Sequence, residues 1–147
     1  MINIRIIPCI SYAQVHDPTN EINDQQIRDM SWGPLRMVRT WPMYIINGYK
    51  FHTDSWSQGK STRNSGVCTR GSVYGQPEDD YYGILQEVIQ LEYPGLPIKQ
   101  VVLFNCTWFD PTPRRGTRIH DQYGIVEVRA NRRYNRYDPF ILASQAH

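Results

Sequence analysis

Residues 44–52 read Tyr-Ile-Ile-Asn-Gly-Tyr-Lys-Phe-His, and this stretch decides the fold class. The dipeptide Asn47-Gly48 accepts positive φ at both positions, which is what a two-residue type I′ turn requires. The residues on either side are rich in Tyr, Ile and Phe, which favour strands. We therefore predict a β-hairpin with strands at residues 44–46 and 49–52.

Outward from this hairpin, the sequence predicts further strands separated by turn-forming residues. The longest candidate spans residues 81–93, where β-branched and aromatic content and the following Pro94-Gly95 favour a strand over a helix. Gly83 is expected to mark a bulge within it. Residues 100–109 are almost continuously apolar, which is typical of a central strand buried on both faces. Shorter strands are expected at residues 67–70, 125–129 and 140–143.

Six or seven short strands with frequent turns predict a mainly β fold, either a small partly open barrel or a small sandwich. The aromatic content of 12%, with ten Gly and ten Pro, agrees with many turns between short strands. Long loops and at most one or two short helices complete this prediction.

The first 30 residues differ from the rest of the chain. Isoleucines alternate with other residues at 2–6, which predicts a short strand, and residues 21–30 are weakly helical. Trp32-Gly33-Pro34 then breaks the chain. We expect an N-terminal extension or linker at residues 1–29, for which disorder is one expectation, and one β domain at residues 30–147.

The cysteine pattern and the absence of long apolar runs narrow the class of protein. Cys9, Cys68 and Cys106 are widely spaced and no signal peptide precedes them, so we expect a reducing, intracellular compartment. No stretch approaches the roughly 20 apolar residues of a membrane span. Cys68 and Cys106, with His52 and His120, lack the spacings of structural zinc sites. We therefore expect no metal, cofactor, small-molecule substrate or membrane partner, and no catalytic residue.

Charge is distributed unevenly, although the net charge is only +2. Residues 36–70 and 114–136 are basic, whereas residues 76–93 are acidic. Guanidinium groups in loops suit phosphate contacts, and interleaved aromatic rings can stack on bases. The candidate nucleic-acid-binding residues are Arg114, Arg115, Arg132, Arg133, Arg136 and Tyr134. The alternative interpretation is a solvated arginine-rich loop without a ligand.

A second candidate surface would bind a peptide such as a histone tail. An aromatic cage attracts a methylated ammonium group, and neighbouring acids attract a basic tail. The candidate residues are Trp56, Tyr81, Tyr82, Asp79 and Asp80. Trp56 stands in a polar loop and is expected to be the most exposed tryptophan, whereas Trp108 is expected in the core.

Five motifs carry a resemblance to a known family. They occupy residues 44–53, 64–67, 80–85, 101–110 and 138–145. In order and spacing they resemble a plant family of unknown function, found beside transposase domains in CACTA (En/Spm-type) DNA transposons. The resemblance implies a plant, nuclear, transposon-derived context with a separate transposase partner and no established catalytic activity. Residues 1–29 do not look like that family.

A further resemblance concerns the strand pattern alone. The strand around residues 84–91, the strand at 101–109 ending in Trp-Phe, and residues 139–144 resemble a bromo-adjacent homology (BAH) domain. Such domains are SH3-like barrels of chromatin proteins, so this resemblance implies an SH3-like or BAH-like barrel.

These observations together predict a non-catalytic accessory binding module in the nucleus. Its expected partners are DNA or a histone tail, and a transposase. One alternative is a protein–protein interaction or structural domain of a transposase assembly. Another is an inactive transposon-derived fragment, which would fold poorly.

Overall fold

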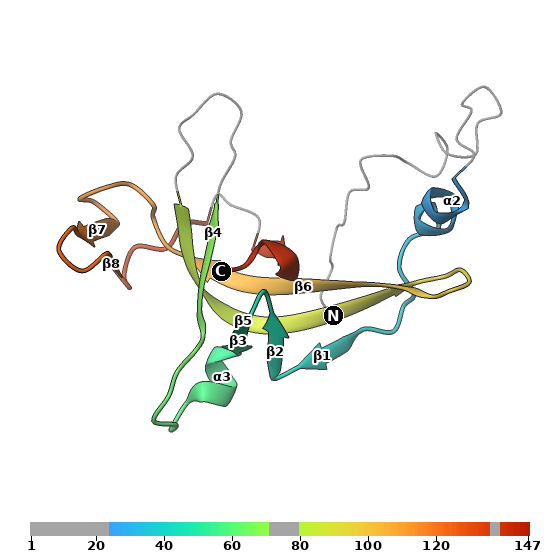
Figure 1. Ribbon diagram of the computed structural model, residues 1–147, viewed down its shortest axis with the longest axis horizontal. Helices are drawn as coiled ribbons and strands as arrows, with labels where there is room; N and C mark the ends of the chain where they lie inside the picture. Colours follow the sequence, from blue (N-terminus) through green and yellow to red (C-terminus); the bar gives the residue numbers. More distant parts are fainter. Residues whose placement is uncertain (1–23, 71–79, 136–138) are drawn as a thin grey trace. The chain divides into compact units, whose positions relative to one another are not determined.

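The computed structural model describes residues 24–70, 80–135 and 139–147. Its two long strands, β5 (Asp80–Tyr93) and β6 (Lys99–Trp108), lie side by side in one sheet (Figure 1). Both strands were predicted from their apolar, β-branched and aromatic content, and both are confirmed. β5 ends directly before Pro94-Gly95, and Gly95 has a φ of 136° that favours glycine.

Three short strands complete this sheet in the order β1-β5-β6-β9, with β4 also paired to β5. β1 (Arg39–Trp41) and β4 (Gly66–Arg70) run antiparallel to successive parts of β5. β9 (Phe140–Leu142) runs antiparallel to β6, which is therefore central, as predicted. Leu103 and Phe104 are consecutive and both buried, so β6 is covered on both faces at this point.

The predicted hairpin consists of β2 (Met43–Ile46) and β3 (Tyr49–His52), paired over all four residues. Asn47 and Gly48 have φ values of 52° and 79°, as a type I′ turn requires. The turn is also held from outside the hairpin. Asn47 Nδ2 donates to the carbonyl oxygens of Ser144 at 2.9 Å and Ala146 at 3.1 Å. The hairpin prediction is confirmed.

The hairpin and the sheet share one aromatic core. The Phe51 ring lies 5.2 Å from the Phe104 ring, and the Tyr44 ring meets Phe104 edge-on at 6.2 Å. Trp108 is 3% exposed and belongs to the core, as expected. The buried residues of this cluster are Phe51, Val67, Tyr81, Leu85, Val88, Phe104, Cys106, Trp108, Ile141, Ala143 and Ala146.

The prediction of a bulge at Gly83 is wrong for the pairing of β5 with β4. The β4–β5 register continues through the pairs Val67–Gly83 and Cys68–Tyr82 without an extra residue. The glycine is needed for another reason. A Cβ atom at Gly83 would lie 2.7 Å from Cε3 of Trp108, so only glycine lets this ring pack against the strand.

A second hairpin, β7 (Thr117–His120) and β8 (Ile125–Val128), projects from the β5–β6 pair (Figure 1). β8 confirms the strand predicted at residues 125–129. β7 was not predicted, because its four residues are polar or half-exposed and follow directly on a loop of Pro, Arg and Gly.

The chain forms two compact units. Unit 2 contains residues 39–90 and 102–147, and so both hairpins and the core. Among the described residues, unit 1 contains residues 24–38, which include α2 (Gln25–Ser31), and residues 91–101. Asp29 of this helix pairs with Lys99 at 3.1 Å. The helix ends immediately before the predicted breaker Trp32-Gly33-Pro34.

The prediction of a mainly β, partly open fold with at most two short helices is confirmed. In the described ranges the α-helices are α2 and α3 (Asp54–Ser57), a 3₁₀ turn η1 (Ala143–Gln145) follows β9, and no closed barrel forms. None of the helices in these ranges is long and apolar enough to cross a membrane. The strand expected at residues 2–6 lies outside the described residues, and the domain boundary at residue 30 stays a prediction.

Candidate nucleic-acid interface

The basic side chains of unit 2 are concentrated in residues 110–135, which we call the arginine arm. The arm comprises the loop after β6, the β7–β8 hairpin and the return segment to residue 135. Its six arginines are all exposed, and three acids accompany them. The arginines are Arg114, Arg115, Arg118, Arg129, Arg132 and Arg133.

A tight loop fixes the start of the arm. Asp110 Oδ1 accepts hydrogen bonds from the Thr112 hydroxyl at 2.6 Å and the Thr112 amide at 3.0 Å. These bonds, more than the nearby Arg115, hold the pKa of Asp110 below its usual range. Arg114 adopts a φ of 65°, and its amide donates to the Thr117 carbonyl at 2.8 Å. The loop therefore turns Arg114 and Arg115 outward in a defined conformation.

Three of the arginines line one cleft of about 830 Å³. Arg114 comes from the loop, Arg118 from β7, and Arg129 directly follows β8. Asp121 and Glu127 also line the cleft, and His120 Nε2 lies 3.1 Å from Glu127 Oε2. The His120 contact is the main reason why the pKa of Glu127 is lowered. The cleft therefore combines three arginine guanidinium groups with two acidic side chains, of which Glu127 lies against His120.

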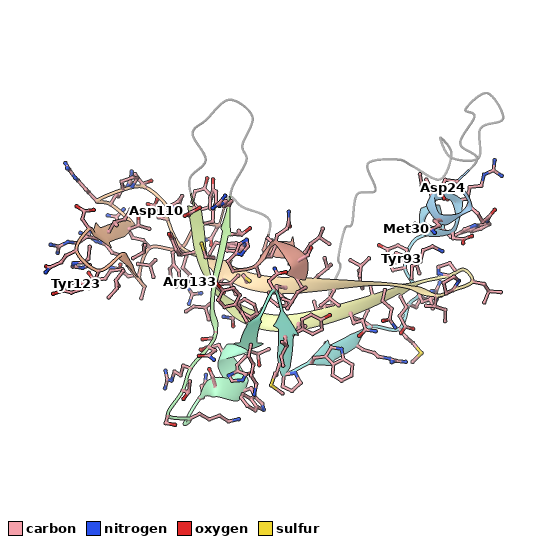
Figure 2. The ribbon with its side chains drawn as sticks, in the orientation of Figure 1. Asp24, Met30, Tyr93, Asp110, Tyr123 and Arg133 are labelled. Carbon is pink, nitrogen blue, oxygen red and sulfur yellow. The ribbon has the colours of Figure 1, made fainter. Side chains whose placement is uncertain are left out.

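A second hollow of about 420 Å³ lies at the base of the arm. Asp110 and Arg133 mark this base in Figure 2, and Tyr123 marks the far end of the arm. Phe109 and Arg133 form a β-bridge, which ties the return segment to the end of β6. The lining residues are Asp110, Thr112, Arg115, Arg133, Tyr134 and Asn135.

The structure divides the predicted nucleic-acid residues between these two concavities. Arg114 lines the larger cleft, whereas Arg115, Arg133 and Tyr134 line the smaller hollow. Arg132 is exposed and is not among the residues that line either concavity. Its carbonyl oxygen accepts a hydrogen bond from the Asp110 amide at 3.1 Å. Arg136 lies outside the described residues.

Tyr134 is poorly placed for the stacking role that its neighbours suggested. It is partly buried against the core, with its ring 5.9 Å from that of Tyr81. Tyr123, in the turn of the hairpin, is 69% exposed and is the better candidate. Tyr123, Arg118 and Arg129 were not predicted as site residues, because β7 was not predicted and its pairing with β8 brings them into one arm.

The predicted peptide-binding residues do not form one cage. Tyr81 is 6% exposed and belongs to the core, and Tyr82 is half-buried on β5, where burial is the main cause that raises its pKa to about 12. Asp80 is exposed at the start of β5, and Asp79 lies outside the described residues. Trp56 was expected to be the most exposed tryptophan, and this is wrong, because Trp32 is 65% exposed whereas Trp56 is half-buried. Trp56 belongs to α3, and its ring is tilted against that of His52 with 4.3 Å between ring centroids.

The cysteines of the described residues, Cys68 and Cys106, both have a raised thiol pKa and are therefore not activated as nucleophiles. Burial raises the pKa of Cys106 to about 12, so its thiol is neutral at physiological pH. Burial also raises the pKa of Cys68. In the part of the chain that the structure describes, no three His, Cys, Asp or Glu side chains gather as metal ligands do.

A family model described as Domain of unknown function (DUF4216) matches residues 89–147. Searches of curated proteins and of solved structures give no significant match. Residues 89–147 are thus similar to this family of unknown function, and the matched range includes the whole arginine arm.

Proposed function

We propose that this protein is a non-catalytic accessory module that binds DNA through the arginine arm. The observation that carries this proposal is the cleft in which Arg114, Arg118 and Arg129 converge from three consecutive pieces of chain. Guanidinium forks bind phosphate oxygens in pairs, and three of them around one cleft can follow a phosphate backbone.

The smaller hollow extends this surface toward the core. Arg115 and Arg133 line it together with the polar groups of Thr112 and Asn135. Arg115 Nε lies 3.8 Å from Asp110 Oδ2, which orients the guanidinium without burying it. The two concavities share the loop that starts the arm, so both can contact one backbone. Tyr123 at the tip offers an exposed ring on which a base or sugar can stack.

The biological setting in our proposal is a plant, transposon-derived protein in the nucleus. The support for it is the resemblance of the five motifs to the family found beside CACTA transposases. In that setting the catalytic chemistry belongs to the transposase, and this module contacts DNA or chromatin beside it.

The test is fluorescence anisotropy of the full chain with labelled duplex DNA across a salt series. We expect binding that weakens steeply with salt, because phosphate contacts release counterions. The double variant Arg132→Ala with Arg133→Ala should weaken binding at least about tenfold at moderate salt, or about 1.4 kcal/mol.

The matched control is Arg36→Ala with Arg63→Ala, which removes the same charge from exposed positions outside the arm. It should change affinity much less than the arm variant. Equal losses for both pairs would mean that only net charge matters. Absence of binding at low salt would remove the DNA proposal.

One observation favours a different class, a protein–protein interaction domain of a transposase assembly. Ile119, Tyr123 and Ile125 of the arm are between 57% and 69% exposed. Such side chains also suit a protein partner. DNA binding that fails while a transposase binds the arm would support this second function.

A further inference from the structure

One arginine of the arm is held by a carboxylate. Arg115 Nε lies 3.8 Å from Asp110 Oδ2, and both residues line the smaller hollow. Among the residues that the structure describes, Arg115 is the one arginine of the arm that forms such an ion pair. Arg115 therefore differs in its surroundings from the arginines of the larger cleft, although it directly follows Arg114 in sequence.

The carboxylate partner is itself fixed. Both hydrogen bonds from Thr112 go to Asp110 Oδ1, so Oδ2 is left for Arg115. The same bonds hold the pKa of Asp110 below its usual range, so the carboxylate is charged at neutral pH. The side chain of Asp110 is only 17% exposed, compared with 67% for that of Arg115. Asp110 is thus a fixed anchor beside an accessible guanidinium group.

The backbone around Arg115 is fixed as well. The amides of Arg115 and Gly116 both donate to the Thr112 carbonyl oxygen, at 3.2 Å and 2.9 Å. A Cβ atom at Gly116 would overlap the Asp110 carbonyl oxygen, so glycine is needed for the loop to close this tightly. Backbone and carboxylate together limit where the Arg115 guanidinium group can lie, which is the pre-organisation that directional recognition requires.

The ion pair leaves the end of the guanidinium group for a ligand. Asp110 contacts Nε, at the base of the group, so this contact does not use the two Nη amino groups at its end. The nearby carboxylate also balances part of the positive charge, which weakens the general attraction to phosphate. The parallel N–H bonds keep their direction, and such a fork suits two neutral acceptors side by side.

We propose that Arg115 recognises guanine through its O6 and N7 atoms, and that Asp110 is the residue that positions Arg115. Guanine presents these two acceptors next to each other on one edge, where arginine binds both. Adenine presents N7 beside an amino group, which the fork cannot satisfy. This inference rests on the proposed DNA-binding function, in which other arginines hold the phosphate backbone and Arg115 adds a preference for a base.

The test compares two duplexes of identical sequence in fluorescence anisotropy with the full chain. One contains guanine, and the other contains 7-deazaguanine, in which a C–H group replaces N7. We expect the guanine duplex to bind about fivefold more tightly, because the modified base lacks one of the two acceptors. Both affinities should fall with salt while their ratio stays nearly constant, since a base contact releases no counterion.

Three variants assign the ratio to residues. Arg115→Ala should bring it close to one. The matched control is Arg133→Ala, which removes the same charge from the same hollow and should weaken both duplexes equally, so that the ratio is kept. Asp110→Asn keeps an oxygen for the Thr112 bonds but loses the charge that holds Arg115, so it should lower the ratio.

A further variant covers the case in which Asp110→Asn disturbs the loop. Arg115→Lys keeps the positive charge and loses the fork, so it should lower the ratio without changing the affinity for the 7-deazaguanine duplex. The same comparison with single-stranded oligonucleotides that contain isolated guanines identifies the source of the base. A ratio seen only in duplexes places the contact in the major groove, and one seen only in single strands indicates an unpaired guanine.

Three results would overturn the proposal. Equal binding of guanine and 7-deazaguanine in both duplexes and single strands would show that no N7 contact forms, although the DNA-binding function would stand. A ratio that persists in Arg115→Ala would assign the preference to another residue. Absence of binding to every oligonucleotide at low salt would remove this inference together with the DNA-binding proposal.

Discussion

The two hairpins of unit 2 have the same length and different surroundings. β2–β3 and β7–β8 each pair four residues with four residues in an unbroken register. In β2–β3, Phe51 is 3% exposed and Tyr44 and Ile46 pack against the core. In β7–β8, only Thr117 is buried, and Ile119 and Ile125 are more than half exposed.

The two hairpins are also attached to the rest of the protein at different places. Asn47 in the first turn reaches the carbonyl groups of Ser144 and Ala146, almost a hundred positions later in the chain. The second hairpin is tied at its base, where the Arg129 amide donates to the Gly116 carbonyl at 2.9 Å. The first hairpin therefore stabilises the fold, whereas the second presents charged side chains at little cost to stability.

The largest effect should come from Phe51→Ala. Removal of a buried ring that contacts Phe104 leaves a cavity, and we expect a loss of about 3–5 kcal/mol in the free energy of unfolding. Urea denaturation measures this loss. The control in the other hairpin is Ile119→Ala, whose side chain is 61% exposed and should cost less than about 0.5 kcal/mol. Similar losses in both variants would mean that the arm belongs to the folded core after all.

The next effect concerns binding alone. The triple variant Arg114→Ala, Arg118→Ala and Arg129→Ala should weaken DNA binding about hundredfold, or about 2.8 kcal/mol. It should also reduce the slope of log affinity against log salt by about three, since each arginine neutralises about one phosphate.

The thermal midpoint of this triple variant should stay near that of the natural protein, because all three side chains are exposed. A large drop in the midpoint would contradict the division of roles between the hairpins. An unchanged salt slope would show that the cleft does not contact phosphate.

A smaller effect is expected from the turn of the first hairpin. Asn47→Ala removes two side-chain hydrogen bonds and places alanine at a φ of 52°, so we expect a loss of about 2 kcal/mol. Asn47→Gly separates the two causes, because glycine accepts this φ but lacks the amide. Urea denaturation should give the glycine variant a loss of about 1 kcal/mol. Equal losses in the two variants would mean that the backbone conformation contributes nothing.

The contrast between the hairpins also explains what could be predicted from the sequence. Asn47-Gly48 between Tyr- and Ile-rich segments favours a type I′ turn through the conformational preferences of these two residues alone, so the hairpin could be predicted from it. β5 and β6 are long enough for their apolar content to outweigh any alternative. β7 has neither advantage, because its Thr-Arg-Ile-His sequence becomes a strand only through pairing with β8.

The candidate sites were less predictable, because they depend on contacts between distant residues. Arg114 and Arg115 are neighbours in sequence and line different concavities, since the loop turns at Arg114. Tyr81 and Tyr82 looked like cage residues, but strand alternation turns Tyr81 into the core.

The smallest expected effect is a pH dependence at the end of the first hairpin. His52 is 7% exposed, and neither ring nitrogen has a hydrogen-bond partner in the described part of the chain. Burial, and then the charges of Lys50 and Lys60, lower the pKa of His52 from the usual 6.5. The unfolded chain therefore binds a proton at a higher pH than the folded one. Stability should be full above about pH 6.5 and decrease as the pH falls toward the pKa of the folded state.

Thermal denaturation between pH 7.5 and 5.5 measures this effect, which we expect to be a decrease of about 2–4 °C in the midpoint. His52→Gln removes the titrating group, so its midpoint should decrease less over the same range. His120→Gln is the matched control in the other hairpin and should keep the dependence, because His120 lies beside Glu127 on the exposed arm. Parallel curves for the natural protein and His52→Gln would place the acid sensitivity elsewhere. If the dependence of the thermal midpoint on pH is lost only in His52→Gln, the first hairpin, and not the arm, couples protonation to folding.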